Sequence, residues 1–204
     1  MTAYVTAAAG GVAATLLVLL LAHHTRLQPA AISYTEAVPA GLLLGLSVAA
    51  TAQPAQAAIV MMVAVLGTAA AIVDAHERRL PNLLTATLGA GLLVTAAAIS
   101  LLTGNAEDLL RASVAAVVTV VVALVVKAAR PGVLGWGDVK LLPSLAAALA
   151  WTGVSALAQG FVGWIVLLLA TTAVWRIARF DTGDTVPYGP ALVLGTLGAL
   201  LAGA

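Results

Sequence analysis

The sequence predicts an all-α, polytopic membrane protein, a bundle of about eight transmembrane helices forming one domain over residues 1–204. Apolar residues make up 62% of the chain and charged residues 8%, so a water-soluble surface cannot be assembled from them. The apolar residues occur in runs of roughly 20, the length a helix needs to cross a hydrocarbon core about 30 Å thick. Eight of the nine Lys and Arg residues fall in alternate connections between these runs, as the positive-inside rule predicts.

Eight apolar runs are predicted to be membrane spans: 3–22, 38–52, 55–73, 83–103, 109–126, 133–151, 154–175 and 187–203. The second run is short. A re-entrant pair could replace the second and third spans, so six or seven spans stay possible. A single helix from Leu141 to Trp175 would be about 52 Å long, too long even for a strongly tilted span. A break is therefore predicted at Thr152 and Gly153.

The positive charges orient the bundle. With the N-terminus outside, eight of the nine Lys and Arg residues fall in loops on the cytoplasmic side, and Arg111 falls outside. The eight are Arg26, Arg78, Arg79, Lys127, Arg130, Lys140, Arg176 and Arg179.

Composition also excludes several kinds of site and partner. The absence of Cys removes disulfides, thiolate catalysis and Cys-based zinc sites. A net charge of +1 with scattered cations argues against a nucleic-acid partner. His23, His24 and His76 lack a metal-ligand spacing, so neither a metal nor a cofactor is predicted.

Two acids stand out because they lie at predicted span ends on the cytoplasmic side. The sixth span is long enough only if it includes the residues before Lys140, which places Asp138 inside the inner leaflet. Asp74 ends the third span at the same face, and Glu77 is expected in a solvated loop. An ionisable group at such depth indicates a functional site. The alternative is structural: Asp138 would be a helix N-cap and Asp74 an interfacial acid.

Two such carboxylates suit peptide hydrolysis. An ionised Asp can take a proton from water while a protonated Asp polarises the scissile carbonyl. Two close carboxylates would share one proton. Gly135 and Gly137 would leave room for a substrate backbone, and Pro81 could open a helix at its first position.

Three separated motifs resemble the type IV prepilin peptidases, a branch of the GxGD intramembrane aspartic proteases. Asp74 followed by RRLPN is similar to the first motif of that family, GWGDVKLL to the second, and VPYGPALVLG to the Pro-aromatic-Gly-Pro segment near the C-terminus. The resemblance covers the chain from about residue 55 to its end. It implies Asp74 and Asp138 as catalytic residues. It also implies a set of residues that shape the pocket or hold the substrate: Gly135, Gly137, Lys140, Pro81, Asn82, Gly189 and Pro190.

The resemblance further implies a membrane aspartic endopeptidase that removes the short basic leader from prepilin or pseudopilin precursors. Cleavage would take place at the cytoplasmic face of the bacterial cytoplasmic membrane, with the precursor and the lipid bilayer as partners. The chain matches short members that serve Flp-type or related pili. It lacks the cytoplasmic Cys-x-x-Cys insertion of many relatives, which weakens the case for methyl transfer to the new N-terminus.

Other readings predict different features. A proton- or cation-coupled transporter would carry polar residues through the bilayer midplane and traces of repeated halves, whereas the acids here lie at one face. A catalytically silent assembly factor is a third possibility. GPAL at 189–192 is similar to the Pro-Ala-Leu motif of presenilin-like proteases, but their first acid lies in a different context. The DTG at 181–183 falls in a short helix linker, not in the β-fold loop that soluble aspartic proteases use.

Overall fold

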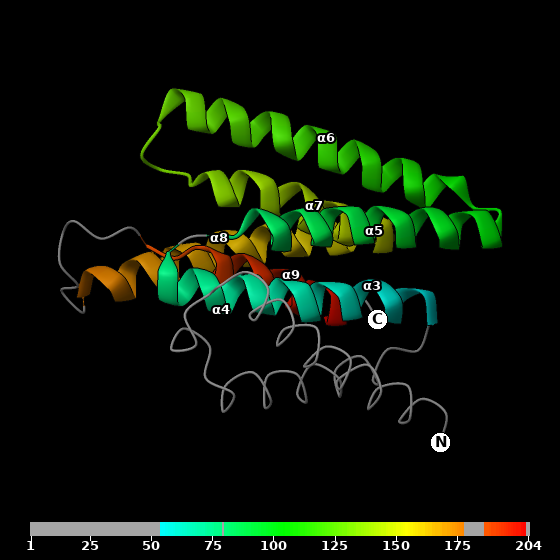
Figure 1. Ribbon diagram of the computed structural model, residues 1–204, viewed down its shortest axis with the longest axis horizontal. Helices are drawn as coiled ribbons and strands as arrows, with labels where there is room; N and C mark the ends of the chain where they lie inside the picture. Colours follow the sequence, from blue (N-terminus) through cyan, green and yellow to red (C-terminus); the bar gives the residue numbers. More distant parts are fainter. Residues whose placement is uncertain (1–53, 79, 178–185, 203–204) are drawn as a thin grey trace, which may run out of the picture.

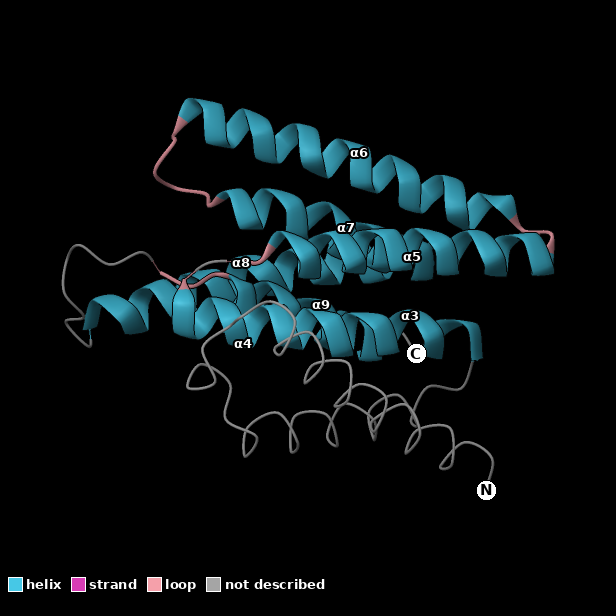
Figure 2. Ribbon diagram, in the orientation of Figure 1, coloured by secondary structure: helices cyan, strands magenta, loops and turns pink. Residues whose placement is uncertain are grey.

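The computed structural model describes residues 54–78, 80–177 and 186–202. Every regular element in these ranges is a helix (Figure 2), which confirms the all-α fold class. In chain order they are α3 (Pro54–Met62), the π-helical turn η1 (Val63–Gly67), α4 (Thr68–Glu77), α5 (Asn82–Thr103), α6 (Ala106–Ala129), α7 (Trp136–Thr152), α8 (Val154–Ile177) and α9 (Gly189–Ala202). The predicted spans 3–22 and 38–52 lie outside the described residues.

Elements α3, η1 and α4 form one continuous helix. Met62 and Gly67, at its two internal junctions, keep right-handed helical backbone angles, so the π-helical turn widens the helix without breaking it. The predicted span 55–73 is therefore found, with one further turn at its end. Asp74 lies inside this helix instead of ending it, and Glu77 belongs to its last turn, not to a loop as predicted.

Successive helices run in opposite directions (Figure 1). Arg78 and residues 80–81, 130–135 and 186–188 consequently lie at one end of the bundle, which we call the motif end, while residues 104–105 and Gly153 lie at the other. Helix α7 is central: it packs against α5, α6, α8 and α9, and its leucines Leu141, Leu145 and Leu149 are fully buried. This packing fixes where the residues that begin α7 are held.

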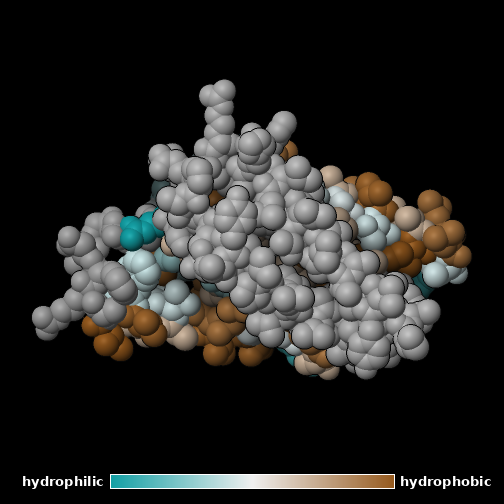
Figure 3. Space-filling model, turned by 60° about the horizontal axis from the view of Figure 1, so that its bottom comes forward, coloured by the Kyte–Doolittle hydropathy of each residue, from teal (hydrophilic) through white to brown (hydrophobic). Residues whose placement is uncertain are grey.

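Four helices are long and apolar enough to cross a membrane: 56–75, 82–103, 106–129 and 154–177. The outer faces of α6 and α8 are apolar and exposed, with examples in Val121, Val125, Ile165 and Leu169. Apolar residues, coloured brown, are correspondingly widespread on the described surface in Figure 3. Such faces are suited to lipid contact and unsuited to water.

The predicted break between the sixth and seventh spans is confirmed. Gly153 has φ 155° and separates α7 from α8, a backbone conformation that favours glycine. Arg111 completes the end of α7 by donating from Nη2 to the Trp151 carbonyl oxygen at 3.0 Å while it pairs with Asp108 at 2.6 Å. The single cation predicted on the outer side thus caps a helix whose last carbonyls need donors.

Several helix starts differ from the predicted span starts. Helix α7 begins at Trp136 and α9 at Gly189, later than the predicted 133 and 187, whereas α5 and α6 begin earlier than predicted. Pro81 is the N-cap of α5 and lies just before the first helical residue, where its missing N–H costs nothing. Helix α6 begins at Ala106, earlier than the predicted 109, because the Asn105 side chain caps it by accepting the Glu107 N–H at 3.1 Å.

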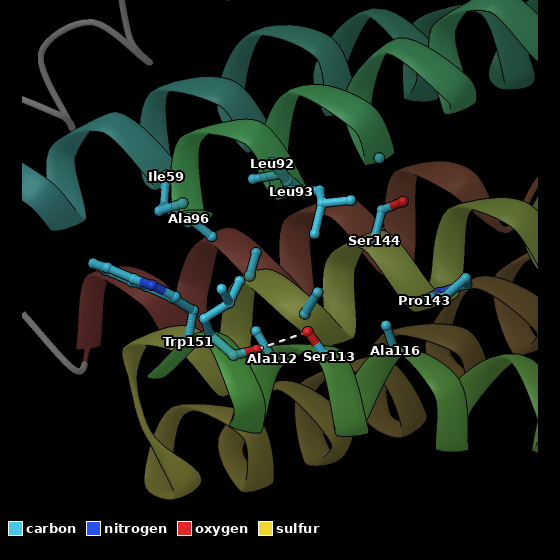
Figure 4. Close-up of a pocket in the computed structure, with 14 residues that line it drawn as sticks. Ile59, Leu92, Leu93, Ala96, Ala112, Ser113, Ala116, Pro143, Ser144 and Trp151 are labelled. Carbon is cyan, nitrogen blue, oxygen red and sulfur yellow. Dashed lines mark hydrogen bonds between the residues drawn. The ribbon is translucent and has the colours of Figure 1, made fainter. Parts of the chain in front are cut away.

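An apolar cavity of about 220 Å³ lies between α3, α5, α6 and α7 (Figure 4). It follows α7 from Pro143 to Trp151 and so extends from the middle of the bundle away from the motif end. Ser113, one of its few polar neighbours, donates to the Leu109 carbonyl oxygen of its own helix. The cavity is therefore lined by apolar surface and contains no acidic or basic side chain that could act in catalysis.

Candidate active site

Asp74 is held by contacts between α4 and α9. Its side chain is buried in the last two turns of α4, and its Oδ2 accepts the backbone N–H of Gly189 at 2.8 Å. Gly189 is the first residue of α9, so its N–H has no acceptor within its own helix. A carboxylate suits this position because the amino end of a helix carries partial positive charge.

Asp138 is the third residue of α7, and Gly135 is the N-cap. The predicted alternative, Asp138 as the N-cap itself, is therefore wrong in position, although its Oδ2 does accept the Gly135 N–H at 3.2 Å. The other oxygen, Oδ1, is buried and has no hydrogen-bond partner among the described residues. Capping accounts for one oxygen of this carboxyl group and leaves the second unexplained.

The two acids, 64 positions apart in sequence, line the same pocket at the motif end. The pocket has a volume of about 570 Å³. Its lining comprises Asp74, Arg78, Leu80, Asn82, Lys127, Pro131, Gly132, Val133, Leu134, Gly135, Trp136, Gly137, Asp138, Val186 and Tyr188. The structure thus brings to one pocket the two acids that the sequence interpretation paired.

Two glycines are needed for close packing around the acids. A Cβ on Gly137 would lie 2.5 Å from the Cβ of Leu80, a distance that real carbon atoms do not reach. A Cβ on Gly189 would lie 2.9 Å from Oδ2 of Asp74. The space at Gly137 is thus taken by Leu80, whereas the sequence interpretation assigned it to a substrate backbone.

The remaining predicted site residues are divided between the pocket and its surroundings. Lys140 donates from Nζ to Oδ1 of Asn82 at 2.7 Å, which joins α7 to the start of α5. Asn82 lines the pocket, while Lys140, Pro81 and Pro190 are outside its lining. Pro190 is the second residue of α9, directly after the glycine that binds Asp74.

Lys127 is a pocket residue that the sequence interpretation did not select. It lies in the last turn of α6, and its Nζ donates to the Leu134 carbonyl oxygen at 2.7 Å and lies 4.8 Å from the centre of the Trp136 ring. Lys127 thereby ties the loop that precedes Asp138 to α6. The sequence shows that Lys127 lies near the end of the helix that precedes the GxGD loop. It does not show the contacts of Lys127, because these depend on how that loop folds.

Tyr188 and Arg78 are two further pocket residues that the sequence interpretation did not select. Tyr188 lies directly before Gly189, and Arg78 follows α4 in a left-handed conformation, φ 54°, with its guanidinium carbon 5.4 Å from the centre of the Trp175 ring. Among the residues that the structure describes, no group of His, Asp and Glu side chains could hold a metal ion. His23, His24 and the DTG at 181–183 lie outside them.

The comparison with protein families agrees with these features. The model of the type IV leader peptidase family matches residues 61–178, a range that contains both acids and ends before Gly189. No curated protein and no solved structure matches the chain. Because the family match covers more than half of the sequence, the chain belongs to the type IV leader peptidase family.

Proposed function

We propose that this protein is a membrane aspartic endopeptidase that removes the short basic leader from type IV prepilin or pseudopilin precursors of the Flp or Tad kind. Membership of the leader peptidase family supports the peptidase activity. The observation that carries the aspartic mechanism is the pocket at the motif end, into which separate helices bring Asp74 and Asp138.

In the proposed reaction, the two carboxyl groups share one proton and activate a water molecule directly. The ionised group removes a proton from the water as its oxygen attacks the scissile carbonyl carbon, and the protonated group donates to the carbonyl oxygen. Transfer of a proton to the amide nitrogen then breaks the C–N bond and releases the leader and the new amino terminus. No covalent enzyme intermediate and no cofactor is required.

Hydrogen bonds around the acids support this proposal. The N–H groups of Gly189 and Gly135 each hold one oxygen of one carboxyl group, which fixes the direction of the other oxygen. Oδ1 of Asp138, buried and without a partner in the described part of the chain, is the atom we assign to contact with the water or the carbonyl oxygen. Preorganised contacts of this kind lower the reorganisation needed during reaction.

Charge supports a cytoplasmic location for the reaction. Lys127, Arg130 and Arg78 lie at the motif end, and Arg111 lies at the opposite end beside Asp108. Excess Lys and Arg marks the cytoplasmic side of membrane proteins. We therefore propose that the pocket faces the cytoplasm and that the precursor presents its leader from that side of the bacterial cytoplasmic membrane.

The test is to co-express a prepilin with the Asp74→Asn or the Asp138→Asn variant. Cleavage is measured as the change in electrophoretic mobility of the precursor. Each variant should accumulate in the membrane at the parent level and leave the precursor uncleaved. Asp108→Asn is the matched control, because Asp108 pairs with Arg111 far from the pocket and its loss should leave processing intact. Cleavage at the parent rate by either pocket variant would refute the dyad. The mass of the mature amino terminus would separately show whether it is methylated.

A further inference from the structure

The apolar cavity between α3, α5, α6 and α7 lies apart from the candidate active site. None of the described residues that line it also lines the pocket of Asp74 and Asp138, and none of them is charged. Its volume of about 220 Å³ is larger than that of an engineered apolar cavity of roughly 150 Å³ that binds benzene. The space is therefore large enough to hold an apolar ligand.

The cavity has a buried floor and an exposed rim. On its floor, Ile59, Leu92 and Ala148 are at most 3% exposed, whereas Leu93 of α5 is 60% exposed at the rim. Helix α6 packs closely along α7 and only sparsely against α5, and Figure 4 shows Leu93 and Ala116 pointing into the space between α5 and α6. Both helices are long and apolar enough to span a membrane, so this rim opens toward lipid.

One polar group in the cavity wall lacks a partner. Trp151 is only 8% exposed, and its Nε1–H is buried without an acceptor among the described residues. Ser100, one turn beyond the lining residue Ala96 on α5, likewise has a buried hydroxyl without a partner in the described part of the chain. Buried donors are normally paired, so an acceptor that enters from outside the protein would complete this end of the cavity.

The wall of the cavity selects among possible ligands. A peptide would bring an N–H and a C=O at every residue, and each of these needs a partner in an apolar environment. An acyl chain in ester linkage brings CH₂ groups and a single carbonyl oxygen, which matches an apolar wall with one free indole N–H. Trp151 lies in the last turn of α7, and Trp is enriched at the headgroup level of membranes.

We propose that this cavity binds one acyl chain of a membrane glycerolipid from the leaflet opposite the motif end. The ester carbonyl oxygen accepts the Nε1–H of Trp151, and the chain follows α7 from Trp151 toward Pro143, which lie at opposite ends of the cavity in Figure 4. The chain would supply contacts that atoms around an empty cavity lack, and so hold α5 against α6 and α7. This site goes beyond the proposed peptidase activity and does not depend on it.

The experiment measures lipid affinity of the purified, delipidated protein in detergent by native mass spectrometry. The first probe is dioleoyl phosphatidylcholine. The second is its diether analogue, which has the same headgroup and equally long chains but no ester carbonyl. Leu93→Trp narrows the cavity, and Val94→Trp is the matched control, because Val94 is 67% exposed on the same helix and does not line the cavity. Trp151→Phe removes the indole donor.

The parent should bind the ester lipid roughly 2- to 12-fold more tightly than the diether, the factor expected for one neutral hydrogen bond. Trp151→Phe should bind both lipids equally. Leu93→Trp should bind both roughly tenfold more weakly, since losing the burial of two CH₂ groups is enough for that factor, and Val94→Trp should match the parent. Equal affinities of the parent for both lipids, or equal effects of the two Trp substitutions, would overturn the assignment.

Nuclear magnetic resonance of the indole N–H groups gives a second readout, because the chain has four Trp residues and Trp151→Phe identifies the signal of Trp151. The ester lipid should shift this proton signal downfield, as a new hydrogen bond does, and the diether should not. The same shift with both lipids would overturn the contact with the carbonyl oxygen. A downfield signal that is present before lipid is added and that neither lipid changes would show that water occupies the site, and would also overturn the proposal.

Discussion

Replacement of Gly189 by Ala tests whether the start of α9 controls Asp74. The added methyl carbon would lie 2.9 Å from Oδ2, 3.1 Å from Cβ and 3.2 Å from Cγ of Asp74. The N–H of residue 189 survives the substitution, but the carboxyl group must move away from it. The hydrogen bond of 2.8 Å between them would then be stretched or lost.

The size of the effect follows from that hydrogen bond. A hydrogen bond to a charged group contributes about 1.5–3 kcal/mol. A change of about 1.36 kcal/mol in the barrier alters a rate tenfold, so prepilin cleavage should slow roughly 10- to 150-fold if the bond is needed in the transition state. The amount of protein in the membrane should change little, because the new methyl group meets one movable side chain.

The assay is the initial rate of prepilin cleavage by purified protein, with Gly198→Ala as the matched control. Gly198 lies on the same helix, and a Cβ added there would meet nothing within 4 Å. The control should cleave at the parent rate and should gain up to about 1 kcal/mol of helix stability, as Gly to Ala changes do. Parent activity in Gly189→Ala, or equal losses in both variants, would refute the reasoning.

Three further predictions concern residues near the pocket. Lys127→Met should slow cleavage severalfold because the loop at Leu134 loses its tie to α6, and Lys127→Arg should restore most of the rate in the same assay. Gly137→Ala should lower both activity and the unfolding midpoint, because overpacking against Leu80 costs about 1–3 kcal/mol; an unchanged midpoint in a detergent melt would contradict this. Trp164→Phe should lower the free energy of unfolding by about 0.5–1.5 kcal/mol, because the hydrogen bonds from Nε1 are lost while the Leu192 carbonyl oxygen keeps the Thr196 hydroxyl as a donor; denaturant titration measures it, and parent stability would contradict the reasoning.

The sequence determined the class of the molecule and the broad placement of its acids. Length and hydropathy located the six described helices, because the hydrocarbon core requires apolar runs of a fixed length. The excess length of 141–175 predicted the break that Gly153 makes. Alternation of direction then brought Asp74 and Asp138 to one end, a consequence of topology that requires no knowledge of side-chain contacts.

The sequence could not determine which backbone groups hold the acids, because those contacts depend on how the helices pack. Gly189 is 115 residues from Asp74 in sequence, and only the approach of α9 to α4 turns its N–H into a carboxylate ligand. The closeness of Leu80 to Gly137 also arises from packing. In lipid the hydrophobic effect does not favour one arrangement of helix pairs over another. Shape complementarity and hydrogen bonds therefore select which helices pack together.

The same distinction explains the residues that were missed. In the sequence, Lys127 is one of several cations in a predicted cytoplasmic loop. In the fold, its ammonium group lies against the Leu134 carbonyl oxygen and the Trp136 ring. The apolar pocket between α7, α8 and α9 cannot be recognised in the sequence, because its lining is brought together from three separate helices. The sequence by itself therefore determined that this is a helical membrane protein and at which helix ends its two acids lie. The tertiary structure alone decided which groups surround those acids, because helix packing brings together residues that no local pattern connects.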